Sequence, residues 1–315
     1  MNSLIRFYNQ NRKTIFIVIA SIIGIIAILQ GLNYLSEKKS EKKLEELSKV
    51  NSGSSSTTIY QPSKSSISST SVSEKTYKEQ STVIDKFIEY CNVGNYTEAY
   101  NLISDECKEE MFPKLEDFIN TYYKTVFGSK KTYYIQNWIG NTYKISITND
   151  ILATGKVEDS KTIVDYYTIV KNNDEQKLNI NNFIGKRKIN TAKEEDGIKI
   201  TVKNSNIHME YIKYDLEITN MSNSNIYMDT LETSKSIFIT DGNGNRYFVY
   251  NNEIIRALLD IKIGETKSLS LKFSSAYVQN KEINSLTFLR VITNYDNYMQ
   301  NKEEYKEFKS IKIDI

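Results

Sequence analysis

The chain has 315 residues, of which 25% are charged and 39% hydrophobic, and its formal net charge at pH 7 is only +2. A balance this close to neutral excludes the broad basic field of nucleic-acid-binding proteins, so no nucleic-acid partner is expected. The single histidine, His208, cannot build a zinc site without other strong ligands nearby, and we expect it on the surface or on an edge strand.

An uncharged stretch, residues 14–36, is the first predicted element. A helix of about 23 residues, at ~1.5 Å per residue, is long enough to cross the ~30 Å hydrocarbon core of a bilayer. The stretch is longer than a signal-peptide core and no Ala-x-Ala site follows it, which favours an uncleaved signal anchor over a cleaved signal peptide. The side chains predicted to span the membrane include Thr14, Ile15, Ile22, Ile25, Ile28 and Leu35.

Charged and polar segments flank this stretch on both sides. Residues 1–13 form a short basic tail, but lysines also follow the stretch, so the positive-inside rule alone leaves the orientation open. Residues 37–75 are predicted to form a stalk, first charged and then rich in serine and threonine, whose side chains bury too little surface to fold. Such a stalk suits a surface protein. We therefore expect a single-pass cell-membrane protein with a cytoplasmic N-terminus and extracytoplasmic C-terminal domains, bound to membrane lipid through the helix.

Helix signals open the region that follows the stalk. A capping box beginning at Thr76 precedes an amphipathic pattern, Asn95 is placed to cap a second helix, and Pro113 fits the first turn of a third, which Gly128 ends. After Gly128 the apolar period changes to two, with a turn at residues 172–174, which is typical of paired strands. Residues 76–188 are therefore predicted to form an α+β domain of three helices plus a curved antiparallel sheet.

The opening of this domain resembles a nuclear transport factor two-like cone. The residues that carry the resemblance are Phe87-Ile88-x-Tyr90-x-x-x-Gly94-Asn95-Tyr96-x-x-Ala99-Tyr100-x-Leu102-Ile103-Ser104 and Phe118-x-x-x-Tyr122. The resemblance points to bacterial extracytoplasmic versions, such as the non-catalytic N-terminal domain of some penicillin-binding proteins and membrane-anchored components of conjugation machines. Some members of the superfamily are isomerases or dehydratases with an Asp or His base inside the cone. This region has no histidine, and Asp117 and Asp165 are its candidate acids.

Residues 189–315 alternate in short strands separated by turns, which predicts an all-β sandwich. The segment resembles the immunoglobulin-like, telokin-type domain of Gram-positive surface proteins, a binding or spacer module. The residues that carry this resemblance are Thr219-Asn220-x-Ser222, Phe238-x-x-x-Asp241-x-x-Gly244-x-x-Tyr247 and Gly264-Glu265-x-Lys267-x-x-x-Leu271-x-Phe273. The fold class predicted for the whole chain is a single N-terminal transmembrane helix, an α+β cone and an immunoglobulin-like sandwich.

Two further patterns bear on chemistry. Asp241-x-Asn243-x-Asn245 imitates the start of a calcium loop, but Arg246 stands where such a loop requires glycine and Asn252 where it requires glutamate, so we interpret it as a hairpin turn. Cys91 and Cys107 fall in neighbouring predicted helices. Outside the membrane they could form a disulfide, and two buried free thiols are equally natural.

The sequence contains no catalytic constellation, and we predict no catalytic, cofactor-binding or metal-binding residue and no cofactor. The leading hypothesis is a non-enzymatic cell-envelope protein with a binding or scaffold role and an envelope protein as partner. One alternative is a small-molecule or enzymatic pocket in the α+β domain. A second alternative is an accessory component of conjugation, secretion or peptidoglycan machinery.

Overall fold

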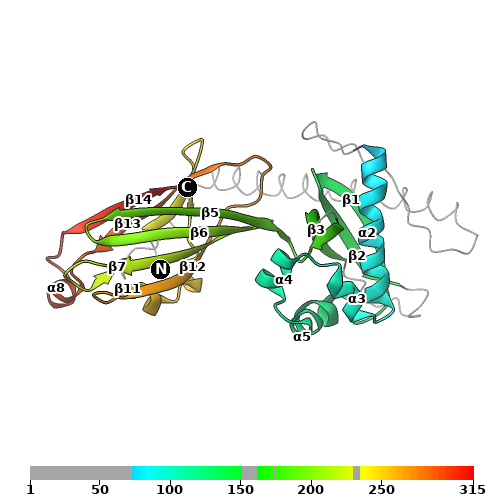
Figure 1. Ribbon diagram of the computed structural model, residues 1–315, viewed down its shortest axis with the longest axis horizontal. Coiled ribbons are helices and arrows are strands. Elements are labelled where there is room, and N and C mark those ends of the chain that lie inside the picture. Colours follow the sequence, from blue (N-terminus) through cyan, green and yellow to red (C-terminus); the bar gives the residue numbers. More distant parts are fainter. Residues whose placement is uncertain (1–72, 151–161, 173–174, 230–234) are drawn as a thin grey trace, which may run out of the picture. The chain divides into compact units, whose positions relative to one another are not determined.

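The computed structural model of the protein describes residues 73–150, 162–172, 175–229 and 235–315, and Figure 1 shows their helices and strands. Strands make up 46% of this part and helices 25%, so the fold is mainly β. The predicted tail, the predicted membrane-spanning residues 14–36 and nearly all of the predicted stalk lie outside the described residues.

The first two helices begin at side-chain caps. Helix α2 (Glu74–Asn92) starts after Ser73, whose hydroxyl accepts the backbone N–H of Thr76, so the predicted capping box at Thr76 lies inside the helix and not at its start. Helix α3 (Tyr96–Asn101) starts after Asn95, whose side chain accepts the N–H of Glu98, as predicted.

The remaining helices of this region differ from the prediction. A helix that the periodicity did not indicate, α4 (Asp105–Met111), is capped by Ser104, whose hydroxyl accepts the N–H of Cys107. The predicted third helix is divided into α5 (Leu115–Asp117), the π-helix η1 (Phe118–Tyr123) and α6 (Lys124–Val126). Since π turns are rare and have no distinctive apolar spacing, a periodicity argument treats such a segment as one α-helix.

A four-stranded antiparallel sheet follows these helices, with its strands in chain order. The helices and the sheet share one core in which Phe87 contacts Phe118, Phe127 and Tyr167 at ring-centroid distances of 5.6–6.3 Å. The strands are β1 (Lys131–Ile139), β2 (Thr142–Asn149), β3 (Ile163–Asn172) and β4 (Glu175–Asn179).

Two further antiparallel sheets are built from the rest of the described chain, and their apolar faces share a second core. This arrangement is compatible with a β-sandwich. One sheet has the order β12-β7-β6-β5, and the other contains β8, β9, β10, β11, β13 and β14. The strands are β5 (Phe183–Glu195), β6 (Ile198–His208), β7 (Ile212–Asn220), β8 (Ile226–Tyr227), β9 (Ile237–Asp241), β10 (Arg246–Phe248), β11 (Asp260–Ile261), β12 (Thr266–Phe273), β13 (Ile283–Ile292) and β14 (Phe308–Asp314), with helix α8 (Tyr295–Gln300) before β14.

Strand β5 runs across the boundary predicted between residues 188 and 189. Its first residue, Phe183, belongs to the core of the helical region, while the strand pairs with β6 from Phe183↔His208 to Glu195↔Ile198. The described residues belong to one compact unit that contains two separate hydrophobic cores.

The predicted fold class is therefore wrong. The described chain is mainly β, and its helical region is not a set of three helices. The coarser prediction of antiparallel sheets compatible with a sandwich is confirmed for the C-terminal half.

The prediction of a single-pass membrane protein with extracytoplasmic domains is also corrected. Within residues 73–150, 162–172, 175–229 and 235–315, no helix combines the length and the apolar character needed to cross a bilayer.

A substitution in the turn between β5 and β6 tests how closely these two strands are joined. Asp196 and Gly197 have φ angles of 52° and 75°, the signature of a tight hairpin turn, and a Cβ on Gly197 would lie 2.9 Å from the Ser222 nitrogen. We expect Gly197→Ala to lower the free energy of unfolding by about 2–4 kcal/mol, because left-handed strain and a backbone clash add. Urea denaturation measures it.

Gly244→Ala is the matched control, since Gly244 also has a positive φ, of 82°, but a Cβ added to it would meet nothing within 4 Å. We expect a loss of about 1 kcal/mol there, from strain alone. Equal losses at the two glycines would show that the close approach of Ser222 is unimportant.

Candidate functional site

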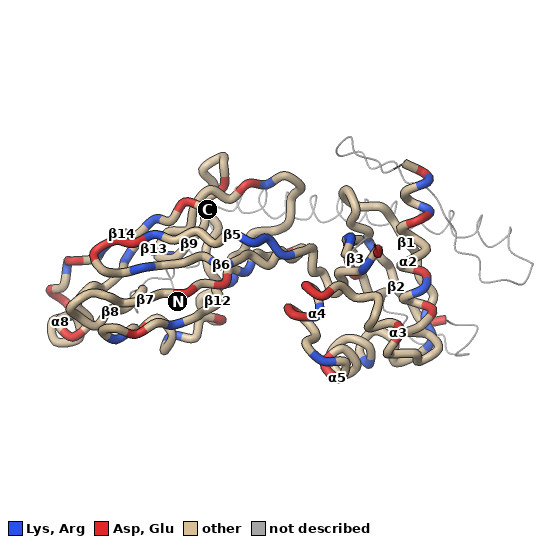
Figure 2. The backbone as a smooth tube through the Cα atoms, viewed as in Figure 1, with Lys and Arg blue, Asp and Glu red and all other residues tan. Residues whose placement is uncertain are grey.

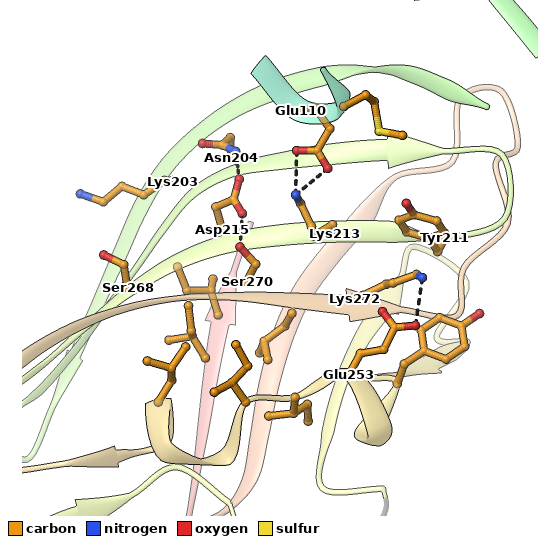
Figure 3. Close-up of a pocket in the computed structure, with 18 residues that line it drawn as sticks. Glu110, Lys203, Asn204, Tyr211, Lys213, Asp215, Glu253, Ser268, Ser270 and Lys272 are labelled. Carbon is orange, nitrogen blue, oxygen red and sulfur yellow. Dashed lines mark hydrogen bonds and ion pairs between the residues drawn. The ribbon is translucent and has the colours of Figure 1, made fainter. Parts of the chain in front are cut away.

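A groove of about 810 Å³ follows strand β12 and is the candidate site (Figure 3). We call it the β12 groove. It is lined by the end of α4, the outer faces of β6 and β7, the segment before β11, and β12 itself. Its residues are Glu110, Met111, Lys203, Asn204, Tyr211, Lys213, Asp215, Leu216, Tyr250, Glu253, Ile254, Ile255, Leu258, Ser268, Leu269, Ser270, Leu271 and Lys272.

Alternation along the strands places the polar side chains of the groove. In β7, Tyr214 and Leu216 are buried in the core, so Lys213 and Asp215 lie on the opposite face. In β12, Leu269 and Leu271 are buried, and Ser268 and Ser270 are exposed. The antiparallel register pairs Ser270 with Asp215, and the hydroxyl of Ser270 donates to that carboxylate at 2.5 Å.

Helix α4 reaches the groove because its acidic residues meet basic residues of the sheet. Figure 2 shows acidic positions on α4 and a basic run in β5, which is Lys186, Arg187 and Lys188. The Lys186 ammonium lies 2.9 Å from a Glu109 oxygen, and the Lys186 backbone N–H donates to Glu106. These contacts bring the next residue along the helix, Glu110, over β7.

The Glu110 carboxylate is largely enclosed, with its side chain only 12% exposed. Its oxygens lie 2.5 and 2.7 Å from the Lys213 ammonium, and one lies 3.4 Å from Nε2 of His208. Burial raises the pKa of Glu110, but the neighbouring His208 ring, the hydrogen bond from Lys213 and the Lys213 charge outweigh it, so the pKa lies below its ordinary value. The carboxylate is therefore ionised at neutral pH.

His208 is buried at the end of β6, with 1% exposure, so the prediction of a surface or edge-strand histidine is wrong. Its ring stacks on Tyr211 at 4.1 Å, and the Lys272 ammonium lies 4.0 Å from the Tyr211 centroid. Lys272 also forms an ion pair with Glu253 at 3.0 Å. The groove thus carries a layered cation–aromatic arrangement at one end.

The other end of the groove is organised by Asp215. Besides Ser270, its carboxylate accepts the side-chain amides of Asn204 and of Asn206, the latter at 2.9 Å. Together with the ion pairs of Glu110 and Glu253, these bonds leave the floor of the groove polar, with its carboxylates held by partners inside the protein.

The candidate acids of the α+β region do not form a comparable site. Asp165 is buried, accepts the Tyr122 hydroxyl at 2.7 Å, and accepts the backbone N–H groups of Tyr166, Asn181 and Asn182. Burial raises the pKa of Asp165, and these donors oppose the rise. The carboxylate therefore holds the turn before β5 to β3.

Asp117 has a simpler role in helix α5, near the start of the predicted third helix. Its carboxylate accepts the Lys114 backbone N–H at 3.0 Å, as a helix-capping contact does.

The two cysteines are free, buried thiols in the helical core, and the structure does not join them. Burial raises the pKa of Cys91, and burial raises that of Cys107 to about 12.

Asp241 lies in the hairpin turn that the sequence predicted. Its carboxylate accepts the N–H groups of Asn243 and Asn245 at 2.9 Å, the Asn245 amide at 3.0 Å and the Tyr247 hydroxyl at 2.8 Å. Donors thus occupy the oxygens that a cation would need. Among the described residues no group of three or more His, Cys, Asp or Glu could hold a metal ion.

In comparisons with known proteins, no family model, no curated protein sequence and no solved structure matches the chain. The groove is therefore interpreted from its own chemistry. Sequence reasoning missed Glu110, Lys213 and Asp215. The alternation in β7 places the latter two on an outer face, but the arrival of α4 at that face has no sequence signal.

The ion pair of Glu110 leads to a stability prediction. We expect Glu110→Gln to lower the free energy of unfolding by about 1–3 kcal/mol, because Lys213 loses its enclosed counter-charge. Glu109→Gln is the control, since the Glu109 side chain is 69% exposed and a surface pair contributes at most about 1 kcal/mol. Equal losses in thermal denaturation would contradict the special role of Glu110.

Asp241 leads to a pH prediction. Hydrogen bonds, the largest from the Asn245 side chain, lower its pKa from 3.8 to about 2. A lowered folded-state pKa means that the ionised carboxylate stabilises the fold above its ordinary pKa, and this contribution is lost as the pH falls toward the folded value. We expect the difference in melting temperature between wild type and Asp241→Asn to shrink as the pH falls from about 5 toward about 2.

Asp314→Asn serves as the control for this titration, because the Asp314 side chain is 86% exposed. Its difference from wild type should stay small throughout. A difference for Asp241→Asn that does not change with pH would contradict the assignment.

Proposed function

We propose that the chain is a non-enzymatic binding protein whose β12 groove holds a segment of a partner protein, in a binding or scaffold role. The observation that carries the proposal is the groove itself, in which an apolar wall faces a polar floor. Ile255 is 66% exposed beside the half-buried Ile254 and Leu258, whereas Ser268 and Ser270 are polar and exposed. An exposed apolar wall beside satisfied polar groups is typical of a surface that excludes water when it binds.

The state of the charged groups supports binding over catalysis. General acid–base chemistry requires a pKa near the working pH, whereas the pKa of Glu110 is lowered and the group is paired with Lys213. Glu253 is paired with Lys272, and Asp215 with amides and a hydroxyl. Each acid of the groove thus has a partner that fixes it in place.

The alternative pocket in the α+β region has less support. Aromatic rings fill its core, and Asp165 is held by four donors. A role as accessory component of conjugation, secretion or peptidoglycan machinery is one version of the proposed function, since it would use the same groove to hold a partner.

Site-specific photo-crosslinking in the cells that produce the chain tests the proposal. A benzophenone amino acid at position 255 should give a crosslinked product of defined mass, because this side chain lies at the groove wall. The same amino acid at position 299 is the control, since Met299 is 48% exposed on α8, outside the groove.

A product from position 255 that disappears in a second variant with Ile254→Asp would support the proposal. Equal products from positions 255 and 299, or none from position 255, would contradict it.

A further inference from the structure

Strand β12 is an edge strand. It lies at the end of the order β12-β7-β6-β5 and pairs with β7 from Thr266↔Thr219 to Phe273↔Ile212. On its other side, within the part of the chain that the structure describes, β12 meets another strand segment only at the bridge Val249↔Phe273. Residues Ser268–Lys272 of β12 line the β12 groove.

One hydrogen bond shows which backbone groups face the groove. The Tyr250 N–H donates to the Lys272 carbonyl at 2.8 Å, so this carbonyl points away from β7. In an antiparallel ladder, the N–H and C=O groups of alternate residues point to the same side. The backbone groups of Ser270 and Ser268 therefore also point away from β7, toward the groove.

The side chains beside this edge match the two faces of a strand. Leu269 and Leu271 are buried, and across the groove Ile254, Ile255 and Leu258 continue the apolar side. Ser268 and Ser270 continue the polar side. An extended segment placed here would direct one set of alternate side chains to the apolar wall and the other to the polar floor.

A competing explanation of this edge is that its lysines protect the protein against aggregation, since lysines on an edge strand discourage pairing with a strand of another chain. Lys267 and Lys272 do flank the edge. However, Lys267 donates to the backbone carbonyl of Ala257 at 3.0 Å, and Lys272 is paired with Glu253 at 3.0 Å. Both cations are held at the ends, and the stretch Ser268–Leu271 between them is uncharged.

We propose that the partner binds as an added β-strand on β12, an extended segment of another protein whose side chains alternate between apolar and polar. The proposal rests on the proposed function of the β12 groove and names its ligand class. Main-chain hydrogen bonds to Ser268 and Ser270 supply affinity, and the apolar wall selects the register of the segment.

The test uses the full chain and a displayed library of random octapeptides as the probe. Peptides are selected on wild type, synthesised, and titrated against Ser268→Pro and its matched control, Ser268→Ala. Proline on an edge strand is compatible with folding where its missing N–H faces away from the sheet, but it removes the donor that an added strand needs. We expect Ser268→Pro to weaken binding about tenfold or more and Ser268→Ala to change it less than about threefold.

A second measurement keeps the test decisive if Ser268→Pro fails to fold. Each selected peptide is made in two N-methylated versions, one methylated at the odd-numbered amides and the other at the even-numbered amides. Both versions are titrated against wild type. Strand addition requires that one methylated version lose binding and that the other bind within about threefold of the unmodified peptide, since only alternate amides face β12. Equal effects of methylation in the two versions would overturn the proposal.

The other outcomes separate strand addition from the proposed function. Peptides that bind Ser268→Pro as well as wild type, but lose binding in Ile255→Asp, overturn strand addition while groove binding stands. Failure to select any peptide also overturns strand addition, and the crosslink from position 255 then decides the proposed function by itself. Dimerisation of wild type that Ser268→Pro abolishes would overturn the assignment of a different protein as partner and identify a second copy as the occupant.

Discussion

The pairing of β5 with β6 is the constraint on which the rest of the structure depends. Strand β5 contributes Phe183 to the helical core. Its partner β6 contributes Ile198, Ile200 and Val202 to the core shared by the other two sheets. A slip of one residue would move Lys186 to the other face of the sheet and away from Glu109. Helix α4 would lose its contact with the strand, and the wall of the β12 groove at Glu110 would move with it.

Three acidic residues show how the chain uses enclosed carboxylates. Asp165 holds a turn to a strand, Asp241 closes a hairpin, and Glu110 attaches a helix to a sheet. Their pKa values move in different directions, because burial dominates at Asp165 and hydrogen bonds or ion pairs dominate at the other two. Asp165 and Glu110 join segments that are far apart in the sequence, and Asp241 joins the residues of one hairpin turn. Each of these three carboxylates thus positions a segment of the chain.

The sequence predicts local features of this fold better than its assembly. Alternation at Tyr214, Leu216 and Ile218 predicted a strand, and Asp241 with Gly244 predicted a turn, because both depend on neighbours along the chain. Strand β5 was missed because its second half is polar and mostly exposed, without an apolar face to reveal it. The β12 groove could not be predicted, since it unites Glu110 with residues some hundred positions later, and the edge position of β12 is a property of the whole sheet.

The buried thiols have a practical consequence. Because the chain has only Cys91 and Cys107, and the thiolate is the reactive form, the folded protein should resist alkylating reagents at both positions. Any labelling of the native thiols therefore reports an opening of the helical core, and the rate of labelling measures how often the core opens. A cysteine added elsewhere on the surface would carry a fluorophore or spin label selectively, with the natural pair left in place.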